Sequence, residues 1–267
     1  MSKLEKALEK AGELREFADS TKTGKVEFLQ EYKTKKISSP YIVTVNQPHS
    51  HVSEEYRRLK SMLIRETKSD FLNTIMVTSS IKDEGKSLTS VNLSIALAQE
   101  IDHSVLLIDA DIRNPMIHQY LGIDFKYGLS DYLLEDIDIS EVLIRTGIGN
   151  MVFLPAGRSV ENPVELLSSK KMKALINDFK HRYMNRYVII DTPPILSCPE
   201  GISIGSYTDG VLFVVREGHA QRTYVEDALS VIQGLNILGV VFNDIKETNA
   251  DGRYSRYYYR TEKREIK

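Results

Sequence analysis

The segment Ser80–Ser87 reads Ser-Ile-Lys-Asp-Glu-Gly-Lys-Ser and has the spacing of a loop that binds phosphate groups. It follows a short β-branched run and precedes a helical pattern, the context in which backbone N–H groups and a helix N-terminus point at an anion. In such a loop Lys86 neutralises charge on the β- and γ-phosphates, and the Ser87 hydroxyl contacts Mg²⁺. The alternative interpretation is an ordinary helix that happens to begin Gly-Lys-Ser.

The loop departs from the usual pattern at three positions. Ser80 stands where a glycine is usual, and Asp83 and Glu84 bring carboxylates into a loop meant for anions, with Lys82 as a partial offset. The spacing still predicts that a nucleotide lies against the whole loop. The residues expected to contact it are Ser80, Asp83, Glu84, Gly85, Lys86, Ser87 and Leu88.

Carboxylates follow two further apolar runs. One run ends Leu107-Ile108-Asp109-Ala110-Asp111, and a later one ends Ile189-Ile190-Asp191. A carboxylate at the tip of a buried strand is costly unless a metal or a hydrogen-bond donor satisfies it. A single aspartate in this position is commonly a helix cap. Three of them in register with a phosphate loop predict one Mg²⁺–nucleotide site and nucleotide-dependent phosphoryl chemistry.

The elements that must position these residues alternate regularly along the chain. Expected strands are Thr74–Thr78, Val105–Asp109, Met151–Leu154, Tyr187–Asp191, Gly210–Val215 and Leu238–Asn243, and expected helices between them include Leu88–Gln99, Ser169–Tyr183 and Thr223–Leu235. Continuous apolar runs indicate strands buried on both faces. The pattern predicts an α/β, three-layer P-loop fold with a mainly parallel central sheet flanked by helices and its ligands at the carboxyl ends of the strands.

Composition excludes several classes of protein. The 267 residues are 42% hydrophobic and 27% charged, with a formal net charge of -2, so no overall charge attracts nucleic acid. The single cysteine, Cys198, excludes an internal disulfide framework. Apolar runs are far shorter than the roughly 18 residues of a membrane span, and the charged start does not resemble a secretory signal. We therefore expect a cytoplasmic protein that reaches a membrane only through a partner.

The chain divides into three regions that differ in composition and in the spacing of apolar residues. Residues 1–50 are rich in lysine and glutamate, and Leu4, Leu8, Ala11 and Leu14 are spaced as in a short amphipathic helix, which either docks on a partner or packs on its own domain. Residues 51–248 carry the P-loop pattern. Residues 249–267 are polar and rich in tyrosine and arginine, as is typical of a mobile tail.

Together the segments Ser80–Ser87, Leu107–Pro115 and Tyr187–Pro194 resemble the Walker A, A′ and B motifs of the bacterial tyrosine kinases. Further similarities are the helix Glu54–Lys60, which resembles the family's Glu-x-x-Arg-x-x-Arg motif, and the segment Asn162–Leu167. The resemblance covers about residues 50–260. The lysine-rich start is most similar to the tyrosine autokinases found with exosortase-linked polysaccharide loci.

The resemblance implies an ATP-dependent protein-tyrosine autokinase that regulates exopolysaccharide synthesis or export. Lys86, Asp109, Asp111 and Asp191 are then the catalytic residues. Asp109 is the first choice for activating the acceptor hydroxyl, Ser87, Asp109 and Asp191 are the expected metal-binding residues, and Asp111 supports the metal and its waters. Asn243 is expected to read the adenine base, with a turn-forming asparagine as the alternative. Arg113 either contacts phosphate or pairs with Asp111.

The expected phosphoacceptors are the tail tyrosines Tyr254, Tyr257, Tyr258 and Tyr259, interleaved with arginines. A tail that stacks on nucleic-acid bases is the structural rival. Glu54, Arg57 and Lys60 recur at three-residue spacing, and the resemblance implies that this helix face joins subunits in a ring. The alternative is a solvated face with a local ion pair. Lys60 replaces the family's second arginine and lacks its bidentate geometry.

The resemblance also implies partners: other copies of the chain, a transmembrane chain-length regulator that activates the kinase, and a tyrosine phosphatase that opposes it. The main rival function is a MinD- or ParA-type ATPase switch. Such proteins carry a signature lysine directly after the first loop residue, where this chain has Ile81, and they lack a terminal tyrosine cluster. A non-catalytic adaptor with a degenerate nucleotide site is the third possibility.

Overall fold

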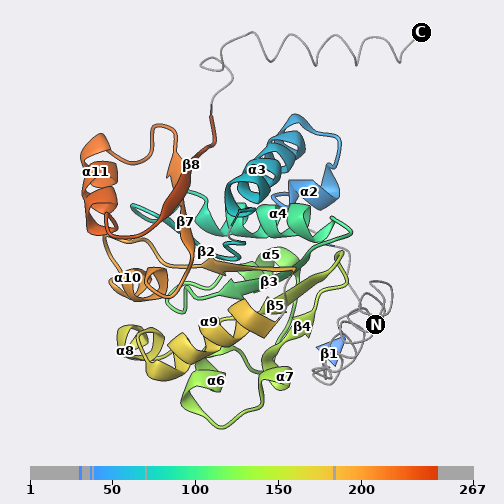
Figure 1. Cartoon of the computed structure of the whole chain (residues 1–267), viewed down its shortest axis with the longest axis vertical. Coiled ribbons are helices and arrows are strands. Elements are labelled where there is room, and N and C mark those ends of the chain that lie inside the picture. The colour runs from blue at the N-terminus through green and yellow to red at the C-terminus, as the bar shows by residue number, and fades with distance from the viewer. Residues whose placement is uncertain (1–29, 32–36, 38, 70, 183–184, 246–267) are drawn as a thin grey trace, which may run out of the picture.

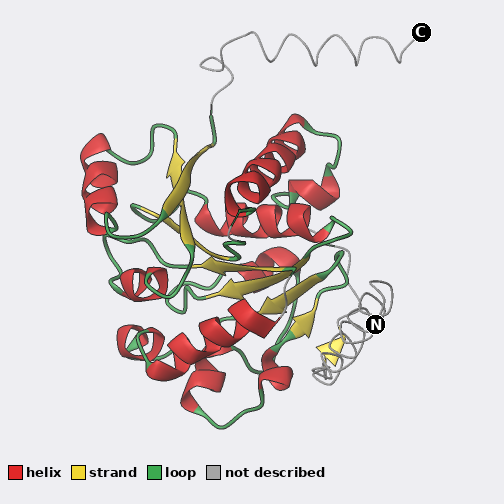
Figure 2. Ribbon diagram, in the orientation of Figure 1, coloured by secondary structure: helices red, strands yellow, loops and turns green. Residues whose placement is uncertain are grey.

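The computed structural model describes residues 30–31, 37, 39–69, 71–182 and 185–245 (Figure 1). The predicted N-terminal amphipathic helix and the four tail tyrosines lie outside these residues and stay predictions. Within the described part, helices surround a twisted central sheet, as the colouring by secondary structure shows (Figure 2).

The sheet contains eight strands in the order β1-β4-β5-β3-β6-β2-β7-β8 among the described residues. Their bounds are β1 (Gln30–Glu31), β2 (Thr74–Ser79), β3 (Ser104–Asp109), β4 (Ile144–Arg145), β5 (Met151–Leu154), β6 (Arg186–Asp191), β7 (Gly210–Arg216) and β8 (Ile237–Asn243). Every neighbouring pair is parallel except β4 with β5. The predicted mainly parallel sheet is therefore confirmed.

Helices cover both faces of this sheet. Their bounds are α2 (Val43–Asn46), α3 (His51–Thr67), α4 (Lys86–Ala98), α5 (Ile117–Leu121), α6 (Leu129–Leu134), α7 (Ile139–Val142), α8 (Pro163–Leu167), α9 (Lys170–Arg182), α10 (Glu200–Gly205) and α11 (Arg222–Val231). Side chains from α3, α4 and α5 pack in one hydrophobic cluster, and side chains from α6 to α11 pack in the other. This is the predicted three-layer arrangement (Figure 1).

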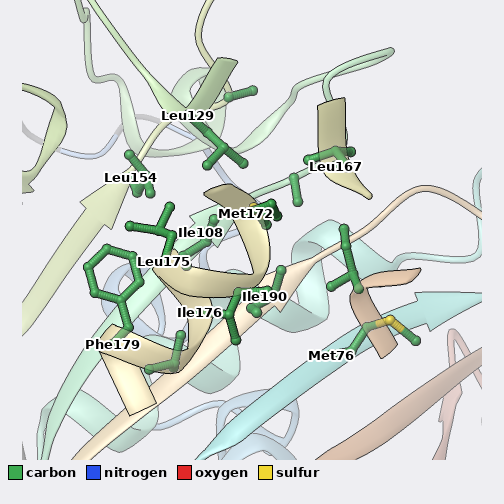
Figure 3. Packing of buried hydrophobic residues seen from close by; sticks show 14 of the residues in the cluster. Met76, Ile108, Leu129, Leu154, Leu167, Met172, Leu175, Ile176, Phe179 and Ile190 are labelled. Atoms are coloured by element: carbon green, nitrogen blue, oxygen red, sulfur yellow. The ribbon is translucent and has the colours of Figure 1, made fainter. Parts of the chain in front are cut away.

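The central strands contribute to both clusters because successive side chains of a strand point to opposite faces. In β3, Val105 and Leu107 pack in the cluster beneath α4, whereas Leu106 and Ile108 pack in the cluster beneath α9. The second cluster also receives Met172 and Phe179 from α9 (Figure 3). Burial on both faces explains why the strand sequences are continuous apolar runs.

The last strand differs from the prediction. β8 lies at the edge of the sheet, and its side chains Val240 and Phe242 are 57% and 52% exposed, so it is not buried on both faces. The helix predicted to reach Leu235 also ends earlier, at Val231, where the chain enters a turn closed by the hydrogen bond from Leu235 N to Ile232 O. An apolar run does not reveal whether its strand is central or at an edge.

Part of the segment assigned to the N-terminal arm packs on the domain itself. Ile42 is fully buried, and both the backbone N–H and the hydroxyl of Thr44 donate to Asn92 Oδ1 on α4, at 3.2 and 3.0 Å. Asn92 in turn donates to the carbonyl of Tyr41 at 3.0 Å. The packed body therefore begins before residue 51. No helix of the described residues combines the length and the apolar character needed to cross a membrane.

Candidate active site

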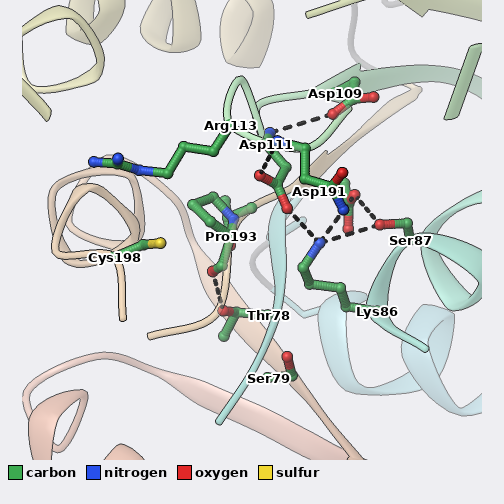
Figure 4. Close-up of polar contacts among 12 residues, drawn as sticks. Thr78, Ser79, Lys86, Ser87, Asp109, Asp111, Arg113, Asp191, Pro193 and Cys198 are labelled. Atoms are coloured by element: carbon green, nitrogen blue, oxygen red, sulfur yellow. Dashed lines mark hydrogen bonds and ion pairs between the residues drawn. The ribbon is translucent and has the colours of Figure 1, made fainter. Parts of the chain in front are cut away.

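The carboxyl ends of β2, β3 and β6 meet at one edge of the sheet, where the phosphate-type loop joins β2 to α4. Asp109 ends β3 and Asp191 ends β6, and the two residues are direct register partners. Asp191 is also the register partner of Val77 on β2, three residues before Ser80. The sheet topology therefore brings together the lysine, the serine and all three aspartates that the sequence predicted (Figure 4).

Lys86 forms the electrostatic centre of the site. Its Nζ donates to Asp111 Oδ2 at 2.7 Å and to Ser87 Oγ at 3.2 Å, and it lies 3.9 Å from Asp191 Oδ2. Burial by itself lowers the pKa of Lys86, but attraction to Asp191 and Asp111 outweighs burial and raises the pKa above the ordinary lysine value. Lys86 is therefore a fixed positive charge at neutral pH.

Asp191 is fully buried and is held by two hydroxyls of α4. Ser87 Oγ donates to one carboxylate oxygen at 2.6 Å, and Ser90 Oγ donates to the other at 3.1 Å. Burial raises the pKa of Asp191, although the charge of Lys86 and the hydrogen bond from Ser87 oppose this effect. Ser90 was not predicted; its position one helical turn after Ser87, on the same face, is the signal that could have found it.

Asp109 is turned toward its own loop. Its two carboxylate oxygens accept hydrogen bonds from the backbone N–H groups of Asp111 and Ile117, both at 3.2 Å, and no dashed line joins it to Lys86 (Figure 4). Burial and the neighbouring charge of Asp191 raise the pKa of Asp109 well above its ordinary value. The side chain therefore lies beside the site, and in this geometry its hydrogen bonds stabilise the loop that carries Asp111.

The loop itself is shaped to face an anion. Gly85 is the N-cap of α4 and has φ +90°, a conformation that favours glycine, and none of the described side chains caps the helix. Glu84 does not oppose an anion, because its buried carboxylate folds behind the loop and accepts from Ser80 Oγ at 2.6 Å and Ile81 N at 2.9 Å. Asp83 is exposed with φ +64°.

The donor set at this edge fits a nucleotide with Mg²⁺. An uncapped helix N-terminus and a lysine suit phosphate, and the Ser87 hydroxyl and Asp191 carboxylate are the oxygen ligands that Mg²⁺ prefers. Within the described residues, no group of three or more His, Cys, Asp or Glu side chains could hold a metal unaided. Mg²⁺ commonly takes only one or two protein ligands and completes its shell with phosphates and water.

Arg113 does not form the predicted pair with Asp111. Its Nε donates to Glu200 Oε1 at 2.7 Å, and its side chain extends away from Lys86 (Figure 4). Glu200 is fully buried in the first turn of α10, so the pair ties the loop after β3 to the start of α10. Eighty-seven positions separate the two residues, and Glu200 stands in no recognisable motif. Sequence alone therefore does not pair them.

Other predicted residues lie apart from Lys86 or have partners of their own. Asn243, at the end of β8, donates from Nδ2 to the carbonyl of Glu84 at 3.0 Å. On α3, Arg57 pairs with Glu54 and also donates to the carbonyl of Pro48, and Lys60 pairs with Glu100 at the end of α4. The local Glu–Arg pair, which was the alternative to a subunit contact, is thus present within one chain.

The raised pKa of Asp191 leads to a stability prediction. Folding raises this pKa, so the buried charge destabilises the protein at pH 8, and the penalty disappears as the pH falls toward the ordinary carboxyl value of about 4. Asp191→Asn should therefore raise the melting temperature at pH 8 and lose this gain toward pH 5. The exposed control Asp178→Asn should change stability by less than about 0.5 kcal/mol at either pH. An Asp191→Asn protein less stable than wild type at pH 8 would contradict the assignment.

Comparisons with known proteins agree with this geometry. A family model described as an AAA domain matches residues 73–234. Tyrosine-protein kinase YwqD of Bacillus subtilis is 31% identical over 221 residues, which is 82% of this chain and 90% of that protein. Tyrosine-protein kinase ptk of Acinetobacter johnsonii is 32% identical over 218 residues, 81% of this chain, but the match spans only 29% of that longer protein.

Solved structures that resemble this chain also include a bacterial tyrosine kinase. The kinase domain of the Escherichia coli tyrosine kinase ETK has a TM-score of 0.73 at 28% identity, covering 78% of this chain and 82% of that one. The septum site-determining protein MinD of Pyrococcus horikoshii has a TM-score of 0.57 at 23% identity over 69% of this chain and 76% of that chain, a likeness that shows the fold alone. The 31% identity to YwqD over 90% of that protein decides between these groups, and the chain belongs to the bacterial tyrosine-protein kinases with a P-loop fold.

Proposed function

We propose that this chain is a protein-tyrosine kinase that transfers the γ-phosphoryl group of ATP to tyrosine. The observation that carries the proposal is the buried cluster in which Lys86 contacts Asp111 while Ser87 and Ser90 contact Asp191. This cluster supplies a fixed cation, a hydroxyl ligand and a carboxylate beside an uncapped helix N-terminus. Phosphoryl transfer depends mainly on such positioning and charge neutralisation.

Each residue of the site then has a separate task. When bound, Mg²⁺ would neutralise charge on the transferring phosphoryl group. Ser87 and Asp191 would be its ligands from the chain, and Asp109, the third predicted metal residue, would first have to release one of its backbone N–H partners. Lys86 would exchange its bond to Asp111 for the phosphates, which leaves the Asp111 carboxylate available to a metal-bound water. Asp109 keeps its predicted role as the base for the tyrosine hydroxyl, provided that it exchanges one of its backbone N–H partners for the phenol.

The test of the proposal is Lys86→Met. Loss of the cation should reduce autophosphorylation at least a hundredfold, because the phosphate charge is no longer neutralised; tyrosine phosphate is measured after incubation with labelled ATP and Mg²⁺. Since the change also leaves Asp111 without its cation, folding is checked by circular dichroism. The control Lys173→Met, at an exposed position of α9, should keep full activity. Undiminished labelling of a folded Lys86→Met protein would contradict the proposal.

The same incubation separates the rival functions. Phosphotyrosine on the protein indicates a kinase, whereas released phosphate without phosphotyrosine indicates a MinD- or ParA-type switch. Neither product indicates an adaptor. The greater identity to the named tyrosine kinases favours the first result.

We further propose that the acceptors are Tyr254, Tyr257, Tyr258 and Tyr259, and that the transfer occurs between copies of the chain. The support comes from the sequence: four tyrosines lie within six positions, interleaved with arginines and directly followed by charged residues. Phosphate would add about -1.5 to -2 charges to each tyrosine and so change how the segment pairs with its own arginines.

Transfer between copies can be measured with two distinguishable chains. A full-length Lys86→Met chain mixed with an active chain that ends at residue 248 should become tyrosine-phosphorylated, because one supplies the acceptor and the other the site. Replacing the four tail tyrosines of the Lys86→Met chain by Phe should remove more than about nine-tenths of the label. Tyr224→Phe, an exposed tyrosine on α11, is the matched control and should leave labelling unchanged. Full labelling of the chain without tail tyrosines would refute the proposed acceptors.

We propose that α3 joins copies of the chain. A second chain could reach this helix because its Glu54–Arg57 pair is partly exposed. A transmembrane polysaccharide chain-length regulator as activator, and a tyrosine phosphatase as antagonist, complete the proposed system in exopolysaccharide synthesis. These two partners rest on the family resemblance. They place the kinase at the inner face of a membrane through the activator.

Arg57→Ala tests the assembly. If Arg57 bridges subunits, the variant should sediment as a monomer at a concentration where wild type is oligomeric. Arg58→Ala, the adjacent residue, which pairs with Glu55 at 2.8 Å, is the control and should sediment like wild type. Arg57 also contacts Glu54 and the Pro48 carbonyl within its own chain, so the melting temperature is compared as well. An unchanged sedimentation profile would contradict a subunit contact at Arg57.

A further inference from the structure

Three consecutive carbonyl groups of the phosphate-type loop are bound from behind by side chains of the β7–β8 edge. The carbonyl of Lys82 lies 3.0 Å from His219 Nε2, that of Asp83 accepts from Arg216 Nη1 at 3.4 Å, and that of Glu84 accepts from Asn243 Nδ2 at 3.0 Å. We call His219, Arg216 and Asn243 the carbonyl clamp. Its residues lie more than 130 positions from the loop in sequence.

The direction of these carbonyls determines the direction of the loop's N–H groups. In a planar trans peptide, the C=O of one residue and the N–H of the next point in opposite directions. Holding the carbonyls of residues 82–84 toward β7 and β8 therefore directs the N–H groups of Asp83, Glu84 and Gly85 to the other side. In the described part of the chain, no group accepts a hydrogen bond from these three N–H groups. Successive free N–H groups of this kind form an anion-binding concavity.

Further contacts fix the clamp itself. The Arg216 guanidinium binds Asp244 Oδ2 through Nε at 2.9 Å and Nη2 at 2.7 Å, and Arg216 is the register partner of Asn243. The backbone N–H of Arg216 lies 3.5 Å from the buried carboxylate of Glu84. A Cβ added to Gly85 would lie 2.0 Å from Asn243 Nδ2, so the loop and the clamp are in close contact.

We infer that the carbonyl clamp positions the loop amides for the triphosphate, and that Arg216, His219 and Asn243 are positioning residues for phosphate binding. The inference deepens the proposed function and depends on it. It also gives Asn243 a role other than adenine recognition, because one of its amide N–H groups donates to the Glu84 carbonyl. A clamp residue acts on phosphates whatever base they carry, whereas an adenine-reading residue acts only when the base is adenine.

The experiment uses a probe without a base. Dissociation constants for inorganic triphosphate, ATP and GTP, each with Mg²⁺, are measured by calorimetry on the full chain. Asn243→Ala and Arg216→Ala should each weaken all three ligands by a similar factor of roughly threefold to tenfold, as expected for one lost hydrogen bond. Asn243→Asp, which keeps the shape but removes the donor, should be at least as weak. Arg222→Ala, an exposed arginine of α11 paired with Glu226, is the matched control and should bind like wild type.

Two results would overturn the inference. If Asn243→Ala weakens ATP but leaves triphosphate and GTP unchanged, Asn243 reads the base and the clamp is wrong. If both alanine variants bind triphosphate as wild type does, the loop amides do not depend on these residues. A wild-type chain that binds neither ATP nor triphosphate would instead refute the proposed function, on which the clamp rests. Melting temperatures near that of wild type ensure that binding, and not unfolding, is compared.

Discussion

The structure of this site depends on one buried interaction, the contact of Lys86 with Asp111 and its proximity to Asp191. Buried carboxylates destabilise a protein unless a cation and hydrogen-bond donors compensate them. Here a single lysine lies against two of them, and hydroxyls of α4 satisfy the remaining oxygens of Asp191. Because the carboxylates outnumber the cation, the cluster attracts further positive charge, which a divalent cation such as Mg²⁺ would supply.

The fold provides this arrangement through its sheet. Parallel strands place their carboxyl ends at one edge, and the register sets Asp109 beside Asp191 while β2 delivers the loop between them. Apolar layers above and below hold the central strands rigidly, so the acidic tips cannot move apart to relieve their repulsion. The pKa values of Asp109 and Asp191 are raised because burial disfavours their charged forms. The charges that the site needs for its function therefore reduce the stability of the folded protein. Uncharged residues at these buried positions would make the folded protein more stable.

Much of the fold and of the site could be predicted from the sequence, because the phosphate-type loop, the strands and the aspartates at the strand ends are local patterns. The apolar runs predicted the strands β2, β3 and β6, and the spacing Gly-Lys-Ser predicted the start of α4 within two residues. Contacts between distant segments could not be predicted in this way. The Arg113–Glu200 pair, the position of Glu84 behind the loop and the exposure of Phe242 on β8 all depend on which elements become neighbours. Asp109 shows the same limit, since its place was predicted but the direction of its carboxylate was not.

The most direct test of the central claim is a crystal structure with Mg²⁺ and a non-hydrolysable ATP analogue. If Lys86 balances the acidic cluster until a nucleotide arrives, its Nζ should leave Asp111 and bind the β- and γ-phosphates, while Ser87 turns its hydroxyl oxygen from Asp191 to the metal. The loop amides of residues 83–87 should point at the phosphates. A nucleotide bound elsewhere, or a Lys86 that still contacts Asp111 beside a bound triphosphate, would contradict the account.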